Sequence, residues 1–160
     1  MTGLVEWDEE YATGISSIDD EHQELIASIN CLHDAIERRV EKQQLLNTLN
    51  DIHDAIHEHF LHEEQLMKKF NYDQYEIHCQ DHARLINDIR SMAEKLENDP
   101  DFDGAALTQR MVDWFSVHLR THDARLYRLH ALIVKDQKAG GIFSLMFGNI
   151  SNAHSGDPDS

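Results

Sequence analysis

The sequence predicts an all-α protein: an up-down-up-down four-helix bundle with an extended N-terminal arm and a short C-terminal extension. The first observation behind this prediction is that apolar residues recur every three or four positions along four long segments, the pattern of helices with one buried face. The second is that the 160 residues include only two prolines, Pro100 and Pro158, so little interrupts those segments. Short connections between such helices make sequence neighbours pack antiparallel around a shared core.

The N-terminal half is expected to form an arm and two helices. Residues 4–17, which include Trp7, lack helical periodicity and are expected to lie extended over the bundle, with the indole at an end of the core. The first helix is expected over residues 19–40. The second is expected over residues 42–70, where Asn71 follows the last apolar position and favours a helix stop.

The C-terminal half is expected to form two more helices. The third helix is expected over residues 75–97 and ends before Pro100, and the fourth runs from residue 104 to about residue 135. Gly140 and Gly141 are expected to break the helix, because glycine is a poor helix former. The chain beyond them therefore has a separate character.

Length and composition predict one domain followed by an extension. With 160 residues, 41% of them apolar, the chain can bury one core. Residues 1–137 are assigned to the helical domain and residues 138–160 to the extension. The apolar run at 139–150 is expected to fold back on the bundle or, alternatively, to dock a signalling partner. The small polar residues from 151 onward are expected to be disordered.

Charge and cysteine usage narrow the classes of partner and compartment. The formal net charge is −16, from 14 Lys and Arg against 30 Asp and Glu. This charge argues against nucleic acid and anionic membrane partners, because their phosphates would be repelled. Cys31 and Cys79 have no close pairing, and no secretory signal or long apolar run is present. A cytoplasmic location is therefore expected, with both thiols packed as small hydrophobic groups.

Five histidines and two carboxylates fall on the apolar faces of the four expected helices. They are His22, His59, Glu63, His78, His82, His118 and Asp123. His59 and Glu63 are four residues apart, as are His78 and His82, so each pair shares one helix face and can share a metal ion. One such pair, in a chain with 12 histidines, more often marks a solvated face. Four faces turned toward one core, however, bring all seven side chains together.

Metal binding is the chemistry expected of these seven side chains. Buried carboxylates and imidazoles are costly in an apolar core unless a cation compensates them. Imidazole and carboxylate ligands without thiolate suit iron, manganese or zinc, and seven ligands suit a pair of ions better than one. His118 and Asp123 are separated by about 140° around an ideal helix. A local bulge or tilt is therefore expected to turn Asp123 inward.

The donor pattern and its flanking residues resemble the hemerythrin family, particularly its bacterial hemerythrin-like members, over roughly residues 5–135. The matching stretches are Trp7 to Gly14, Ile18 to His22, His59 to Glu64, His78, His82, Trp114, His118 and Asp123. The resemblance implies a non-haem centre of two iron ions (Fe) joined by an oxo or hydroxo bridge. It also implies a four-helix bundle built around that centre.

The resemblance assigns each donor a place. It implies that the two carboxylates, Glu63 and Asp123, bridge the ions. The histidines divide unequally, with His78, His82 and His118 completing the ligands of one ion. The two remaining histidines, His22 and His59, leave the other ion with an open position where dioxygen binds end-on.

Side chains next to the donors are expected to line an apolar, water-poor oxygen pocket. The candidates are Ile56, Phe60, Trp114, Phe115, Ser116 and Leu119. Core packing alone also accounts for each apolar candidate. Ser116 stands where the family usually has a branched apolar residue, so its hydroxyl is expected either to raise the polarity of the pocket or to point to solvent.

The function expected from the resemblance is reversible dioxygen binding, for oxygen carriage, storage or sensing, and not enzyme catalysis. One alternative is a di-iron enzyme that reduces peroxide or nitric oxide, which needs a proton relay. Another is an iron-storage or iron-sensing protein. The other histidines are expected at the surface or behind the donors, and His122 is the one most easily mistaken for a ligand because it adjoins Asp123.

Overall fold

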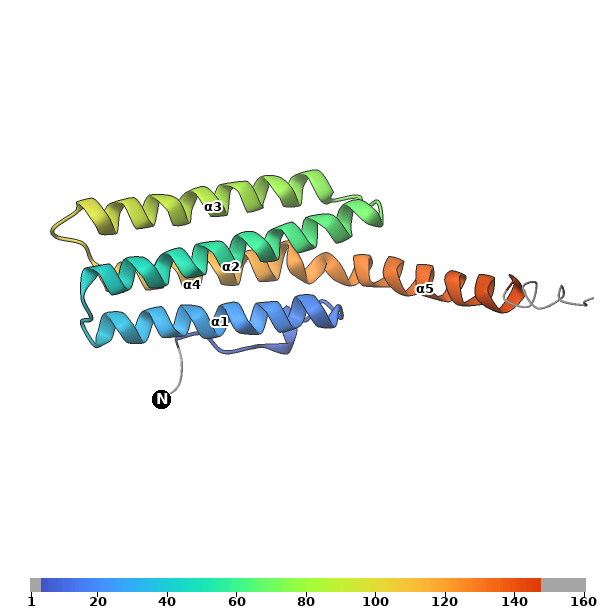
Figure 1. The fold of residues 1–160 in the computed structure, drawn as a ribbon, viewed down its shortest axis with the longest axis horizontal. Helices are drawn as coiled ribbons and strands as arrows, with labels where there is room; N and C mark the ends of the chain where they lie inside the picture. Colours follow the sequence, from blue (N-terminus) through green and yellow to red (C-terminus); the bar gives the residue numbers. More distant parts are fainter. Residues whose placement is uncertain (1–3, 148–160) are drawn as a thin grey trace, which may run out of the picture.

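The computed structural model describes residues 4–147 of the chain, with side chains through residue 140. In chain order the elements are the 3₁₀ turn η1 (Glu9–Tyr11), the helices α1 (Ser16–Glu37), α2 (Lys42–Lys69), α3 (Tyr75–Asn98) and α4 (Gly104–Thr121), the 3₁₀ turn η2 (Asp123–Leu126) and α5 (Tyr127–Phe147). The helices α1 to α4 lie side by side, and α5 continues the line of α4 (Figure 1). The predicted all-α bundle is confirmed, and its fourth helix consists of α4, η2 and α5 in succession.

The first two helices end in the same local motif. At the end of α1, Arg39 has a φ of 52°, and at the end of α2, Asn71 has a φ of 54°. In the second case the Tyr72 N–H donates back to the Met67 carbonyl at 2.9 Å, which closes a Schellman motif. The helix stop predicted at Asn71 is confirmed. The first helix ends three residues before the predicted position 40.

The buried apolar side chains form two clusters at different levels of the bundle. The larger cluster contains Leu25 and Phe60, and the smaller one contains Ile18 and Met67. On α1 and α2, the predicted donors His22 and Glu63 lie between members of the two clusters. The polar side chains therefore occupy a layer that apolar packing closes on both sides.

The N-terminal arm packs on α1 and α4 through specific contacts. Val5 exchanges backbone hydrogen bonds with the Asn30 side chain at 3.0 and 2.8 Å, and Tyr11 is buried. The Asp19 carboxylate accepts hydrogen bonds from the Thr13 and Gly14 N–H groups at 2.8 and 3.1 Å. Asp19 therefore fastens the arm rather than starting the helix, and α1 begins three residues before the predicted start at residue 19.

Three expectations about the C-terminal region and the thiols are wrong. Gly140 and Gly141 do not break the helix, because α5 continues to Phe147. Figure 1 shows that α5 runs away from the bundle instead of folding back, and a Cβ at Gly140 would meet no atom within 4 Å. Cys31 is exposed rather than packed inside, while Cys79 is half-buried. The predicted disordered tail lies outside the described residues.

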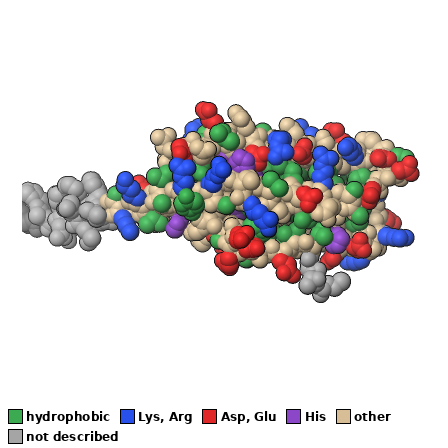
Figure 2. All heavy atoms as spheres, turned by 180° about the vertical axis from the view of Figure 1, so that it is seen from behind, with side chains coloured by type: hydrophobic (Ala, Val, Ile, Leu, Met, Phe, Trp, Pro, Cys, Tyr) green, Lys and Arg blue, Asp and Glu red, His purple; other side chains and the backbone are tan. Residues whose placement is uncertain are grey.

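The surface is polar and charged. Figure 2 shows side chains of both charges spread among hydrophobic and uncharged polar ones on one face of the bundle. None of the helices in the described part of the chain combines the length and the apolar character required to cross a bilayer.

Candidate metal centre

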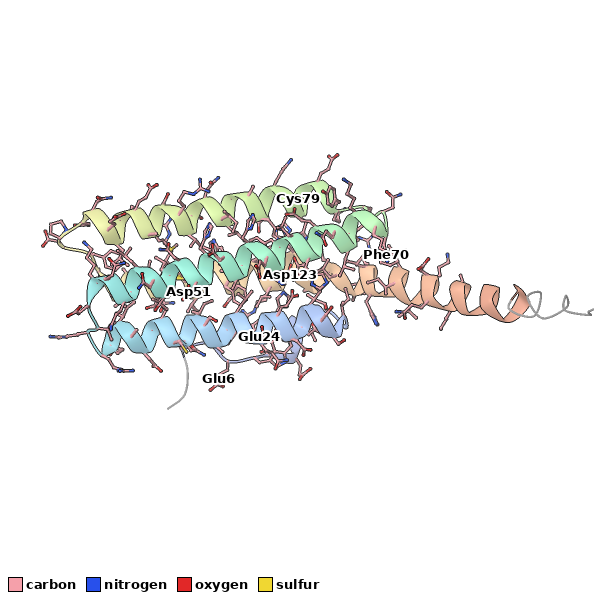
Figure 3. All side chains as sticks on the ribbon, viewed as in Figure 1. Glu6, Glu24, Asp51, Phe70, Cys79 and Asp123 are labelled. Atoms are coloured by element: carbon pink, nitrogen blue, oxygen red, sulfur yellow. The ribbon has the colours of Figure 1, made fainter. Side chains whose placement is uncertain are left out.

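Seven buried side chains converge in the polar layer between the two apolar clusters. They are the sequence-predicted donors, all between 0% and 3% exposed: His22 on α1, His59 and Glu63 on α2, His78 and His82 on α3, His118 on α4 and Asp123 on η2. Figure 3 labels Asp123 among the helices of the bundle, nearer the end from which α5 extends. Each of the four antiparallel segments of the bundle therefore contributes at least one donor, with α4 and η2 counted as one segment.

Glu63 divides its two oxygens between two sets of imidazoles. Its Oε1 atom lies 3.4 Å from Nε2 of His22 and 3.2 Å from Nε2 of His59. Its Oε2 atom lies 3.3 Å from Nε2 of His78 and 3.1 Å from Nε2 of His82. Each oxygen of the Glu63 carboxylate therefore faces a different pair of imidazoles.

Asp123 is divided in the same way. Its Oδ2 atom lies 3.1 Å from Nε2 of His22, and its Oδ1 atom lies 3.0 Å from Nε2 of His78 and 3.1 Å from Nε2 of His118. Two groups with donor atoms within 4.8 Å of one another result: His22, His59, Glu63 and Asp123 in one, and Glu63, His78, His82, His118 and Asp123 in the other. Both groups share the two carboxylates.

A change of helix type places Asp123 in this layer. The α4 helix ends at Thr121, and Asp123 begins the 3₁₀ turn η2, which α5 follows without a loop. A 3₁₀ turn has three residues per turn, so it rotates the backbone differently from a continued α-helix. The local irregularity predicted from the five-residue spacing between His118 and Asp123 is confirmed, and it is a tightening of the helix.

The converging atoms lack hydrogen-bond partners. Nε2 of all five donor histidines and all four oxygens of Glu63 and Asp123 are buried without one. Buried polar groups in native proteins are nearly always satisfied, and unsatisfied ones carry a desolvation cost. Nitrogen and oxygen lone pairs aimed at common points fit two divalent cations. The donor set is therefore a cluster able to hold metal.

The electrostatics of the metal-free layer also favour cations. Burial opposes ionisation of Glu63, but the surrounding imidazoles, His59 foremost, hold the pKa of its carboxyl well below the usual range. Burial likewise disfavours charged imidazoles, yet nearby carboxylates raise the pKa of both rings to about 10, with Glu63 and Glu21 acting foremost on His59 and Asp123 and Glu63 on His78. Protons thus take the place of positive charge that metal ions would supply, and metal binding would displace them.

Three further carboxylates accept hydrogen bonds from donor histidines, on the side of each ring that faces away from the centre. Nδ1 of His59 donates to Glu21 at 2.6 Å; Nδ1 of His82 donates to Glu64 at 2.9 Å; Nδ1 of His118 donates to Asp81 at 2.7 Å. With the proton on Nδ1, the Nε2 lone pair is free to face the centre. Each of these carboxylates comes from the helix before the one that carries its histidine.

The roles of the outer carboxylates Glu21, Glu64 and Asp81 were not predicted from the sequence. One signal was available: Glu21, Glu64 and Asp81 each adjoin a predicted donor in the sequence. The contacts themselves join residues 18 to 38 positions apart, on different helices. Two other histidines lie behind the donors as expected: His62 donates to Glu21 at 2.7 Å, and His122 lies 3.6 Å from Asp81 and outside both donor groups.

The six pocket candidates are not equivalent. Ile56, Phe60, Trp114, Phe115 and Leu119 are buried, whereas Ser116 is half-buried. The Phe60 ring stacks on His82 with ring centroids 3.7 Å apart, and Phe115 meets His22 edge-on at 6.4 Å. Both aromatic rings therefore pack directly against donor imidazoles, and Phe60 also lies 5.8 Å from His59 and 5.4 Å from His118.

A four-helix bundle with histidines and carboxylates converging in its interior defines the class of metal-binding helical bundles. Within that class, residues 13–129 match the family model described as the hemerythrin HHE cation binding domain. The chain belongs to the hemerythrin family. The predicted resemblance is thereby confirmed.

Curated relatives and solved structures agree with this placement. The chain is 28% identical over 148 residues to bacteriohemerythrins of Pseudomonas paraeruginosa (strain DSM 24068 / PA7) and Pseudomonas aeruginosa (strain LESB58), covering 90% of this chain and 95% of each relative. A crystal structure of wild-type hemerythrin superposes with a TM-score of 0.73 at 23% identity, over 79% of this chain and 97% of that one. The structural likeness concerns the fold.

Proposed function

We propose that the seven donors hold two iron ions and that the centre binds dioxygen reversibly. The observation that carries the proposal is the division of the donors into groups of five and four that share both carboxylates. Two ions held by these groups would be bridged twice and ligated unequally, so the group of four leaves room for an exogenous ligand. Membership of the hemerythrin family supports iron over manganese or zinc.

The residues take the following roles in this proposal. Glu63 and Asp123 bridge, while His78, His82 and His118 serve the fully ligated ion. His22 and His59 serve the ion that keeps an open position. The outer carboxylates fix the orientation of three of these imidazoles, because each holds the Nδ1 proton of its histidine.

When bound, a pair of iron(II) ions supplies two electrons that pass to dioxygen and return when it leaves. The chain supplies the dry surroundings that make the return possible. Phe60 against His82 and Phe115 against His22 exclude water on two sides, and the buried Ile56, Trp114 and Leu119 extend this apolar lining. We assign the chain a binding role rather than a catalytic one.

Carriage, storage and sensing make different demands on α5. Asp123 begins η2, and α5 follows it directly. A displacement of the Asp123 carboxylate would therefore be transmitted along a continuous helix to the part of α5 outside the bundle. Sensing, with a signalling partner on residues 139–150, requires that oxygen alter the hydrogen-exchange protection of α5. Unchanged protection in α5 favours storage or carriage.

Metal content and an optical spectrum test the proposal. The reduced protein is measured before air, in air, and after the oxygen is removed. We expect two irons per chain, with charge-transfer bands that appear in air and vanish on deoxygenation. Zinc, a single metal ion, or bands that persist after oxygen removal would each contradict the proposal.

A di-iron enzyme that reduces peroxide or nitric oxide is the second candidate, and one contact favours it. Glu21 accepts hydrogen bonds from both the buried His59 and from His62, whose side chain is 34% exposed. This chain of groups links the donor set to solvent and could deliver protons. Steady consumption of peroxide with added reductant would favour the enzyme, and a single stoichiometric reaction would favour the binding protein.

A further inference from the structure

We propose that the two donor groups bind divalent ions in a fixed order. The five-donor group (Glu63, His78, His82, His118 and Asp123) binds first and tightly, and the four-donor group (His22, His59, Glu63 and Asp123) binds second and exchangeably. The inference rests on the proposed metal centre. It adds that the supply of free divalent metal decides whether that centre is complete.

The five-donor group is held in place before any ion arrives. Nδ1 of His82 donates to Glu64 at 2.9 Å, and Nδ1 of His118 donates to Asp81 at 2.7 Å. Asp81 is itself held, because its other oxygen accepts a hydrogen bond from Arg84 at 2.7 Å. Two of the three imidazoles in this group therefore keep Nε2 directed at the centre, and little order has to be created when an ion binds.

The four-donor group has less support. Nδ1 of His59 donates to Glu21 at 2.6 Å, but His22, at 0% exposed, has no protein partner for its Nδ1. An imidazole that binds a metal ion through Nε2 carries its proton on Nδ1. Ligation by His22 therefore leaves an N–H group buried without a protein acceptor, which weakens binding at this group.

The shared carboxylates also favour one ion over two. Glu63 and Asp123 belong to both groups, are fully buried and supply two negative charges between them. One divalent ion neutralises these charges, so a second ion adds two positive charges to a layer that is already neutral. Like charges repel strongly at low dielectric constant, and a bridging hydroxide offsets only one of the two charges. The second ion is therefore bound more weakly than the first.

The outer carboxylates do not reverse this order. Two of them, Glu64 and Asp81, hold imidazoles of the five-donor group, and only Glu21 holds one of the four-donor group. Donor number, support of the rings and placement of the outer charges thus all assign the first ion to the same group.

The exchangeable position is the one that the proposed function uses. In that proposal the four-donor group keeps the open position, so oxygen binding requires free metal above the dissociation constant of the second step. Manganese and zinc accept the same imidazole and carboxylate ligands as iron. Exchange at the four-donor group would therefore give a mixed-metal centre without disturbing the first ion.

Titration of the metal-free protein with cobalt(II) alone tests the order. Calorimetry gives the stoichiometry and affinity of each step, and the visible absorption of bound cobalt follows the change in its ligands. We expect two steps of one ion each, with a second dissociation constant about 10- to 100-fold larger than the first. A single step that takes up two ions together would overturn the order. A total other than two ions per chain would instead contradict the proposed centre.

Two matched variants assign the steps to the groups. Glu64→Gln removes the charge that holds an imidazole of the five-donor group, and Glu21→Gln removes the charge that holds one of the four-donor group. We expect Glu64→Gln to weaken the first step and bring the two constants together, and Glu21→Gln to weaken the second and separate them, each by about tenfold. The control for net charge, Glu94→Gln/Glu97→Gln, changes exposed positions on α3 and should leave the ratio unchanged. A change of the ratio in the same direction in Glu64→Gln and Glu21→Gln would overturn the assignment.

Exchange in the wild type tests the same order without a substitution. Protein that holds two cobalt ions is mixed with excess zinc(II), and native mass spectrometry follows the cobalt that stays bound. We expect one cobalt ion per chain to be replaced at least about tenfold faster than the other, because differences in affinity appear mainly in dissociation rates. A form with one cobalt and one zinc ion should therefore accumulate. Loss of both cobalt ions at one rate would overturn the exchangeable position.

Discussion

At the scale of single residues, the donor imidazoles are fixed from two sides. Nε2 of His118 faces Asp123 at 3.1 Å, while Nδ1 donates to Asp81 at 2.7 Å. A ring held at both nitrogens cannot rotate without breaking a contact, so little conformational entropy is left to lose when an ion binds. The same reasoning applies to His59 with Glu21 and to His82 with Glu64.

Asp81→Asn tests this outer contact. The amide keeps the size of the side chain but removes the charge that holds the Nδ1 proton of His118, so we expect metal affinity to fall about 10- to 100-fold. Competition with a chelator of known affinity measures the change. The control is Asp88→Asn, whose carboxylate lies 3.8 Å from Arg84 and outside the donor groups. Equal affinity of the two variants would show that the Asp81 contact does not support binding.

His118→Ala and His122→Ala separate a donor from its neighbour. His118 contributes to the group of five donors, whereas His122 is partly exposed and belongs to neither group. We expect elemental analysis to find reduced iron in His118→Ala and unchanged iron in His122→Ala. Helical circular dichroism of both variants serves as the folding control. Iron loss in His122→Ala would contradict the assignment of ligands.

The seven donors and the three outer carboxylates differ in how far the sequence could predict them. The donors could be predicted because His22, Glu63 and His78 each lie among apolar residues that recur with the helical period. The sequence of one helix is enough to show which of its faces is buried. The outer carboxylates Glu21 and Asp81 lie on the polar edge of such stripes. Their partners are on other helices, and only the packing of those helices brings them into contact.

At the scale of elements, helix ends show where local rules were sufficient. Asn71 tolerates the left-handed conformation, and its φ of 54° fits the predicted stop. Arg39 adopts a φ of 52° although its side chain has no such preference. The Val40 N–H donates to the Ala35 carbonyl at 3.2 Å, so the hydrogen bonds of the helix end hold Arg39 in this conformation, which its residue type did not indicate.

Arg39→Gly should stabilise the protein. Removing Cβ relieves the strain of the left-handed region, so we expect the free energy of unfolding to rise by about 0.5 to 1 kcal/mol. Chemical denaturation measures the change. The control, Arg38→Gly, alters a residue with φ −77° and ψ −4°, where glycine only adds freedom to the unfolded chain and should destabilise. A lower stability of Arg39→Gly would show that its side-chain contacts outweigh the strain.

The helix break predicted at Gly140 and Gly141 is absent for an energetic reason. Each glycine costs only about 1 kcal/mol in a helix interior, and α5 enters this region as a helix that is already nucleated. Its beginning is anchored by the buried Leu126 and Leu129 and by the Arg128–Asp73 ion pair at 2.6 Å. Two glycines without a following proline are therefore insufficient to end it.

At the scale of the whole molecule, a polar layer divides the bundle core into two apolar clusters. Seven donors in that layer carry buried atoms without hydrogen-bond partners, and the chain as a whole has a formal charge of −16. Both features make the metal-free fold less stable than its apolar burial suggests. Cations that bind only the folded chain offset both costs, so metal binding and folding are linked.

The linkage should depend on pH. In the metal-free protein the pKa values of His59 and His78 are raised to about 10 and that of His118 to about 9, because nearby carboxylates outweigh the cost of burial. The stability from these protonated rings is complete below the unfolded value of 6.5 and is lost as the pH rises through 9 to 10. Metal ligation needs the unprotonated rings, so the affinity for metal rises over the same range.

Thermal unfolding with and without bound metal tests this linkage. We expect the difference in Tm between loaded and metal-free protein to widen by roughly 5 °C or more between pH 6 and pH 9, and loading in weak buffer at pH 7 to release at least about one proton per chain. The double variant Glu94→Gln/Glu97→Gln serves as a control for net charge and should show the same widening. A Tm difference independent of pH, with no proton release, would mean that the donor imidazoles are already neutral in the metal-free fold. The buried carboxylates would then lack compensation until metal arrives, and the metal-free bundle should be the less stable form at every pH.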